Sequence, residues 1–158
     1  SQVVPGKVDI GGDYDAIVLA AAGIERLGLS RPDVYPIATE TCLPAPGQGA
    51  LAVECVVNSP ALEFLQPLID PDLERCIRAE RGVSAGLGAD CALPVAAMAV
   101  LTESAEISLS ALVADATGQR ILKAQALADD PAAVSKDVVT QLYAAGAQEL
   151  LDSVRRTR

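Results

Sequence analysis

Three segments in the second half of the chain are candidates for β-strands. The clearest is residues 106–114, where the alternating apolar positions are Ile107, Leu109, Ala111 and Val113. This period is typical of a strand that buries one face. Residues 115–118 between two of the segments predict a hairpin turn. We therefore predict strands at residues 93–101, 106–114 and 120–128.

A helical period flanks these strands, and each helix is predicted to begin in the same way. The three start signals are Ser59-Pro60, Asp70-Pro71 and Asp130-Pro131. Serine and aspartate cap helix N-termini, and proline is favoured at the first helical position. Helices are predicted at residues 59–68, at 72–85 and from 131 toward the C-terminus. The last carries an apolar stripe at Val134, Val138, Leu142 and Ala145.

Residues 71–158 thus predict a small α+β domain, with a three-stranded antiparallel sheet and helices on one face. The earlier residues give an α/β signal instead. Residues 14–20 are an apolar run of the buried type found in parallel sheets, and a short helix at 21–28 follows, ending at Gly28. Residues 43–49 are rich in proline and glycine and predict a hinge, and 50–57 predict a further strand.

Composition narrows the possible partners. Hydrophobic residues make up 51% of the chain, which favours a folded core over disorder. The net charge of −9 disfavours nucleic acid, because phosphate binding needs a basic surface. No apolar run is long enough to span a bilayer, and the N-terminal residues do not resemble a signal peptide. We therefore expect a cytoplasmic protein without a membrane partner.

The residues that bind metals are sparse. Histidine is absent, and the four cysteines contain no CxxC pair, so we expect no metal site. Cys42, Cys55 and Cys76 are interpreted as buried small apolar residues of a reduced protein. Cys91 differs, because it lies in a loop of small residues between a predicted helix and a predicted strand.

Four stretches taken together resemble the porphobilinogen deaminase family, also called hydroxymethylbilane synthase. They are residues 14–29, the Leu-Pro-Ala-Pro-Gly-Gln-Gly-Ala run at 43–50, the Ala-Glu-Arg of 79–81, and the loop around Cys91. The run at 43–50 is long and specific. The resemblance covers nearly the whole chain, and the order and spacing of the four stretches also fit.

The resemblance implies a transferase of tetrapyrrole (haem and porphyrin) biosynthesis. The family joins four porphobilinogen units into hydroxymethylbilane and releases ammonia, on a dipyrromethane primer linked to a cysteine. It has three domains, two of them similar to periplasmic binding proteins. By this likeness residues 1–43 are the remnant of the second domain, and 44–70 are the hinge and crossover segment of the first. Residues 71–158 are the C-terminal domain that carries the cofactor.

The resemblance also assigns site residues. Cys91 matches the dipyrromethane-bearing cysteine, with a buried free thiol as the alternative. Arg26 matches an arginine that binds substrate carboxylates, the alternative being a solvated helix residue. Arg81 and Gln48 are possible ligands, with an ion pair and a hinge role as their alternatives. No catalytic residue is assigned, because the family aspartate lies outside this chain.

Some positions depart from the family pattern. Ala89 and Asp90 stand where the family has two glycines, and Val56 stands where an arginine is common. We therefore keep two main hypotheses. The chain is a C-terminal piece of the enzyme, inactive alone and needing the missing N-terminal domains, or a non-catalytic remnant that serves as a binding or assembly module. An unrelated α+β domain is the third and weakest.

Overall fold

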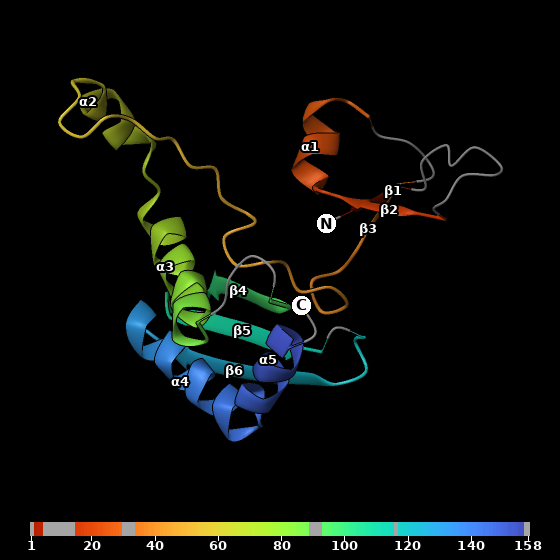
Figure 1. Ribbon diagram of the computed structural model, residues 1–158. Coiled ribbons are helices and arrows are strands. Elements are labelled where there is room, and N and C mark those ends of the chain that lie inside the picture. Colours follow the sequence, from red (N-terminus) through yellow and green to blue (C-terminus); the bar gives the residue numbers. More distant parts are fainter. Residues whose placement is uncertain (1, 5–14, 30–33, 89–92, 116, 157–158) are drawn as a thin grey trace. The chain divides into compact units, whose positions relative to one another are not determined.

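The computed structural model describes residues 2–4, 15–29, 34–88, 93–115 and 117–156. The chain divides into two compact units, Ser1–Pro44 and Ala45–Arg158 (Figure 1). Within the described residues, no helix is both long and apolar enough to cross a membrane.

Among its described residues, the first unit contains three short strands and one short helix. Strand β1 (Gln2–Val4) pairs antiparallel with both β2 (Ile17–Leu19) and β3 (Tyr35–Pro36), in the order β2-β1-β3. Helix α1 (Ala21–Arg26) follows β2 directly. Its end is marked by Gly28, which has a φ of 63°. The helix and its glycine stop confirm the prediction.

The predicted pairing of residues 14–20 was wrong. The strand there is β2, it is antiparallel to its neighbour, and all three of its side chains are exposed within the described structure. A short apolar run indicates an extended strand, but its direction and burial depend on segments elsewhere in the chain. The α/β part of the fold prediction therefore does not hold for the described sheet, which is antiparallel.

The second unit opens with a segment that has little regular structure. Helix α2 (Ala61–Leu65) and the 3-10 helix η1 (Gln66–Leu68) replace the single helix predicted at 59–68. The Ser59 hydroxyl accepts a hydrogen bond from the Ala61 N–H at 3.2 Å, but the N-cap of α2 is Pro60 and not Ser59 as predicted. The strand predicted at 50–57 is absent, because no other strand pairs with these residues.

The α+β prediction for the rest of this unit is confirmed. Strands β4 (Val95–Leu101), β5 (Ile107–Ala114) and β6 (Ile121–Ala128) form an antiparallel sheet in the order β4-β5-β6. Ala97 lies opposite Ala111, which lies opposite Ala124, so these three residues share one face. The hairpin predicted at 115–118 joins β5 to β6, closed by a hydrogen bond from the Asp115 N–H to the Arg120 oxygen.

Both aspartate caps of the large helices form as predicted. Helix α3 (Pro71–Gly86) begins after Asp70, whose carboxylate accepts from the Asp72 and Leu73 N–H groups at 3.0 Å each. Helix α4 (Pro131–Ala144) begins after Asp130, whose carboxylate accepts from the Ala133 N–H at 2.8 Å. Each cap satisfies N–H groups that have no partner inside the helix.

The C-terminal helix is interrupted, which the sequence did not predict. Helix α4 ends at Ala144, and α5 (Ala147–Arg156) starts after Gly146, which has a φ of 100°. Ala145, predicted to lie on the buried stripe, is exposed because it lies at the break. The other stripe residues, Val134, Val138 and Leu142, are fully buried.

The core lies between the sheet and one layer of helices. Figure 1 shows α3, α4 and α5 over the same face of the β4–β6 sheet. On the opposite face Val100, Ile121 and Leu127 stay exposed, as the alternation along each strand requires. The largest fully buried side chains belong to Val83, Leu87, Ile107, Leu109, Val113, Val134, Val138, Leu142 and Leu151.

Two glycines let α3 and α4 approach closely. A Cβ added at Gly82 would lie 2.7 Å from the Ser135 Cβ, and one at Gly86 would lie 2.8 Å from a Val139 methyl carbon. These distances leave no room for a side chain, so helix packing explains both glycines.

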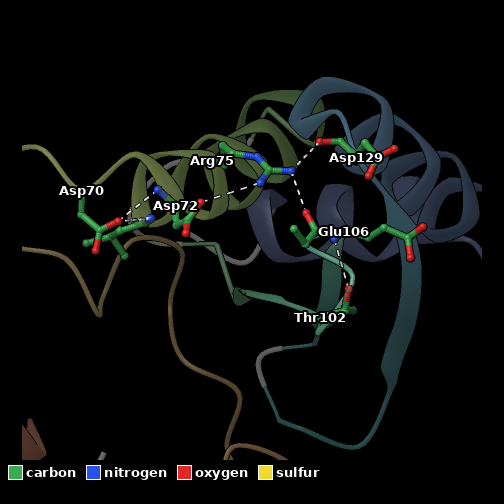
Figure 2. A network of polar contacts seen from close by, with 8 residues as sticks. Asp70, Asp72, Arg75, Thr102, Glu106 and Asp129 are labelled. Carbon is green, nitrogen blue, oxygen red and sulfur yellow. Dashed lines mark hydrogen bonds and ion pairs between the residues drawn. The ribbon is translucent and has the colours of Figure 1, made fainter.

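Arg75 fixes the other end of α3 to the sheet. Figure 2 shows its guanidinium between two loops, where Nη2 donates to the Ala105 oxygen at 2.9 Å and to the Asp129 oxygen at 3.1 Å. Asp72, 3.8 Å away, orients it. The Thr102 hydroxyl closes the nearby turn by accepting from the Glu106 N–H at 3.1 Å. Arg75 thereby holds the turn between β4 and β5 and the connection from β6 to α4 against helix α3.

Candidate functional site

Glu80 joins three parts of the second unit. The side chain projects from α3 and is only 7% exposed. One carboxylate oxygen accepts from the Gly47 N–H at 2.7 Å, and the other accepts from the Ala99 N–H on β4 at 2.8 Å. Because β4 is an edge strand of its sheet, the Ala99 N–H needs a partner outside the sheet. Glu80 supplies it and ties the proline-glycine turn to the sheet.

The Glu80 carboxylate is held by backbone N–H groups alone. No cationic side chain in the described part of the chain forms an ion pair with it. A buried carboxylate is costly unless it is hydrogen-bonded, and the two N–H groups meet that need. The Ala-Glu-Arg stretch at 79–81 contains Glu80 but does not indicate which groups its side chain contacts.

Gln48 lies in the turn that Glu80 anchors. The preceding residue, Gly47, has a φ of 76°, which glycine adopts without strain. The Gln48 N–H donates to the Ala45 oxygen at 3.0 Å and closes the turn, while its side chain is exposed. The structure thus places Gln48 at the surface beside a fixed backbone turn.

Arg81 follows Glu80 on α3 but is exposed. Its guanidinium forms no ion pair or hydrogen bond with the other described residues. Arg26, at the end of α1, is likewise exposed and unpaired there. Arg81 and Gln48 belong to the second unit, whereas Arg26 belongs to the first. Because both guanidinium groups are exposed and unpaired within the described residues, each presents a planar set of donors suited to a carboxylate.

Cys91 lies outside the described residues, together with Ala89 and Asp90. Both flanks of this segment are well anchored. Leu87 on one side is 2% exposed, and Leu93 on the other is 7% exposed, and both belong to the core. The four residues 89–92 therefore connect two fixed points.

The remaining cysteines differ from one another. Cys76 is buried in α3, as predicted. Burial raises the pKa of the Cys76 thiol, and the Glu80 carboxylate adds to the effect. Cys55 is half-buried, and Cys42 is exposed, so the predicted burial of Cys42 was wrong. Across the residues the structure describes, no cluster of three or more His, Cys, Asp or Glu side chains could hold a metal ion.

Comparison with known families matches most of the chain in two pieces. Residues 6–63 match the family model "Porphobilinogen deaminase, dipyromethane cofactor binding domain". Residues 74–144 match "Porphobilinogen deaminase, C-terminal domain". The two matches occur in this order without overlap, and Cys91 falls within the second.

Curated relatives carry the same name. The porphobilinogen deaminase of Acidithiobacillus ferrooxidans is 43% identical over 145 residues, which are 91% of this chain and 47% of that protein. Those of Geobacillus sp. and Stenotrophomonas maltophilia are 41% and 42% identical, over 47% and 48% of their lengths. This chain thus spans about half the length of the curated relatives it matches. The chain belongs to the porphobilinogen deaminase family.

Proposed function

We propose that this chain is part of an enzyme of tetrapyrrole biosynthesis. The enzyme is a transferase that joins four porphobilinogen units into hydroxymethylbilane with release of ammonia. One observation carries the proposal: two models of this family match the chain one after the other, at residues 6–63 and 74–144. Because the chain spans about half of its relatives, we propose the activity for the complete protein and not for these residues alone.

The residues present fit the chemistry of a dipyrromethane cofactor. Its acetate and propionate groups need cationic donors, and the exposed guanidinium groups of Arg26 and Arg81 are unpaired within the described chain. We propose Arg26 as a substrate-binding residue, and Arg81 and Gln48 as further candidates. Cys91 is the proposed attachment point. Its sulfur would bond to the aminomethyl carbon of a porphobilinogen unit while the C–N bond breaks, and the amine would leave as ammonia with the thiol proton.

Exposed apolar residues support the proposed need for the missing N-terminal domains. Between residues 45 and 70 the structure leaves Leu51, Val53, Val56, Val57, Phe64 and Leu68 largely exposed. Such patches mark surfaces that pack against another part of a protein. We propose that residues 1–43 derive from a domain similar to periplasmic binding proteins, and that 44–70 cross back to the first domain.

Intact mass tests the attachment. The chain is made in cells that synthesise porphobilinogen, and peptide mapping then locates any added mass. We expect a dipyrromethane-sized adduct on Cys91. The variant Cys91→Ser should lack the adduct, while Cys42→Ser, which removes an exposed cysteine, should keep it. A bare thiol at Cys91, even when the missing half is co-expressed, would contradict the proposal.

Porphobilinogen consumption tests the activity. We expect none from this chain alone and measurable consumption after an N-terminal half from a relative is added. Turnover by the isolated chain would overturn the proposed dependence on the missing half.

A non-catalytic role is the second candidate. The observation that favours it is the pair Ala89 and Asp90, where the family has glycines. A carboxylate next to the cysteine in the sequence opposes ligands that carry carboxylates. In this case the chain serves as a binding or assembly module. Two results together would support this second role. The parent combined with its missing half should consume no porphobilinogen, and the double variant Ala89→Gly/Asp90→Gly should recover that consumption.

A further inference from the structure

The hydrogen-bond pattern of the β4–β6 sheet shows which backbone groups its two edge strands turn outward. Figure 1 shows β5 between β4 and β6. In an antiparallel pair, opposite residues alternate between those that exchange hydrogen bonds and those that do not. The Asp115 N–H donates to the Arg120 oxygen, so by this alternation the even-numbered residues of 122–128 bond to β5. The N–H and C=O groups of the odd-numbered residues of 121–127 therefore point away from the sheet.

The outer edge of β4 is closed by a side chain of α3. The Ala114 N–H donates to the Pro94 oxygen, which by the same alternation turns the odd-numbered residues of 95–101 outward. Ala99 is one of them, and its N–H donates to the buried Glu80 carboxylate at 2.8 Å. A buried acceptor thus covers the middle of this edge.

On β6 a side chain of α4 takes the corresponding place. The Gln141 amide donates from Nε2 to the Gln125 oxygen at 3.2 Å, and this oxygen is one of the outward groups. Gln141 is exposed and precedes Leu142, which is fully buried, so it leaves α4 at the flank of the buried face. The middle of the β6 edge is therefore covered by one exposed glutamine.

We propose that the outer edge of β6 is a pairing surface for the β6 strand of a second copy of the chain, and that Gln141 keeps it closed. An unpaired edge offers a row of N–H and C=O groups to any extended strand. The Gln125 oxygen lies near the centre of this row, where a partner strand must bond, and Gln141 already bonds to it. This closure concerns assembly of the chain and is independent of the chemistry proposed at Cys91.

The residue pattern of β6 fits a second copy of the same strand. Two identical edges related by a two-fold axis pair antiparallel and are self-complementary. With the axis beside Gln125, Lys123 of one copy lies opposite Leu127 of the other, so the aliphatic stem of the lysine meets an apolar side chain. With the axis beside Lys123, two like charges face each other, which is destabilising. The charge pattern therefore favours the register centred on Gln125.

Self-association of the full chain tests the closure. We expect Gln141→Ala to lower the dimer dissociation constant on the order of fivefold in sedimentation equilibrium, since one hydrogen bond no longer competes with pairing. Alanine is the best helix former, so the variant keeps α4. Gln148→Ala, which removes an exposed glutamine from α5, should match the parent. Each variant keeps the exposed apolar residues of 45–70, so association through that region cancels. An unchanged dissociation constant in Gln141→Ala would overturn the closure.

Amide exchange measured by NMR locates the contact. As the concentration of Gln141→Ala rises, the outward N–H groups of 121–127 should gain severalfold protection, whereas the N–H groups already bonded to β5 should change little. Concentration-dependent protection of the outward groups in the parent would overturn the role of Gln141, because the edge would pair with the glutamine in place. Protection confined to other parts of the chain would overturn β6 as the pairing surface.

An added charge tests the register. Leu127 is 52% exposed, so a lysine there should leave the fold intact. Gln141→Ala/Leu127→Lys places this lysine opposite Lys123 of the other copy, and the dissociation constant should return to the parent value or rise above it. Gln141→Ala/Leu29→Lys adds the same charge at an exposed leucine of the first unit and should keep the tighter association. Equal association of the two double variants would overturn the second β6 strand as the occupant.

Discussion

Two neighbouring regions of the second unit use the same aliphatic residues in opposite ways. From residue 71 onward, the valines and leucines of the helices and strands fill a core in which Leu109 and Val138 have no exposed surface. Between residues 45 and 70, Leu51 is 77% exposed and Phe64 is 79% exposed. The first region buries its apolar surface by itself, whereas the second leaves it open to a partner.

The two regions also differ in how they are held. Residues 71–156 are stabilised by layer packing, with aspartate caps and Arg75 closing the ends. Apart from the Asp70 cap at the boundary, residues 45–70 have one side-chain hydrogen bond to that domain in the described structure, from the Gly47 N–H to Glu80. The C-terminal domain thus has a core of its own, and the exposed apolar residues of the preceding segment support the proposal that it packs against another part of the protein.

The largest expected contrast comes from truncating one leucine in each region. Leu109→Ala should lower the free energy of unfolding by about 3 kcal/mol, because it leaves a cavity in the core. Leu51→Ala should change it by less than about 0.5 kcal/mol, because the side chain is exposed. Denaturant unfolding of both variants measures the difference. A comparable loss from Leu51→Ala would show that residues 45–70 are packed in the isolated chain.

Removing the Glu80 link should have the next largest effect. Glu80→Ala leaves two N–H groups without an acceptor and should cost about 2–3 kcal/mol. Glu80→Gln keeps one acceptor oxygen and should cost less. Faster hydrogen exchange at Gly47 and Ala99 would locate the loss, and Glu63→Ala, at an exposed glutamate, is the control. If Glu63→Ala has the same effect, the link is not what holds the turn.

Two helix glycines should respond in opposite directions. Gly82→Ala should destabilise the domain by about 1 kcal/mol, because overpacking against Ser135 outweighs the gain in helix propensity. Gly23→Ala in α1 meets no atom within 4 Å. It should slow exchange in α1 by about threefold through propensity alone. Stabilisation by Gly82→Ala would show that α3 and α4 can separate to admit the methyl group.

The smallest effect concerns the hairpin between β5 and β6. The pKa of the Asp115 carboxyl is lowered. Desolvation by itself would raise this pKa, but hydrogen bonds from the Thr117 hydroxyl and from the N–H groups of Gln119, Arg120 and Thr117 outweigh it. A depressed carboxyl pKa adds stability above the unfolded value of about 3.9, and this stability is lost as the pH falls through the folded value.

Asp115→Asn should therefore lower the denaturation midpoint slightly at pH 7. The gap from the parent should narrow as the pH falls below about 3.9, and it should close once the pH is below the lowered pKa of Asp115. Urea unfolding at both pH values measures this. Asp129→Asn is the control, because its carboxylate accepts no hydrogen bond within the described residues. A gap that persists undiminished at the lower pH would contradict the role of the ionised carboxylate.

Local patterns predicted the C-terminal domain well. The caps at Asp70 and Asp130 and the alternation in residues 106–114 involve neighbouring residues, so the sequence alone contains the needed information. Predictions failed where a distant segment decides. Within the described residues no strand lies beside 50–57 to pair with it, and the direction of β2 is set by its antiparallel pairing with β1.

The candidate site divides in the same way. The sequence pointed to Cys91, Arg26, Arg81 and Gln48 through motifs, and the structure shows the two arginines and Gln48 exposed. It gave no sign that the Glu80 carboxylate would join Gly47 to Ala99, which lie 33 and 19 residues from it in sequence. A glutamate within a helix looks ordinary until tertiary packing brings two backbone N–H groups within reach of its carboxylate.

By itself the sequence determined the family, the α+β class of residues 71–158 and where the large helices begin. Each of these follows from residue types close together in the chain, through capping, side-chain periodicity and motif spacing. Tertiary structure alone decided that Glu80 joins Gly47 to Ala99, and that Gln141 on α4 reaches Gln125 on β6. The physical reason is that hydrogen bonds across long sequence separations exist only after the core has brought their donors and acceptors together.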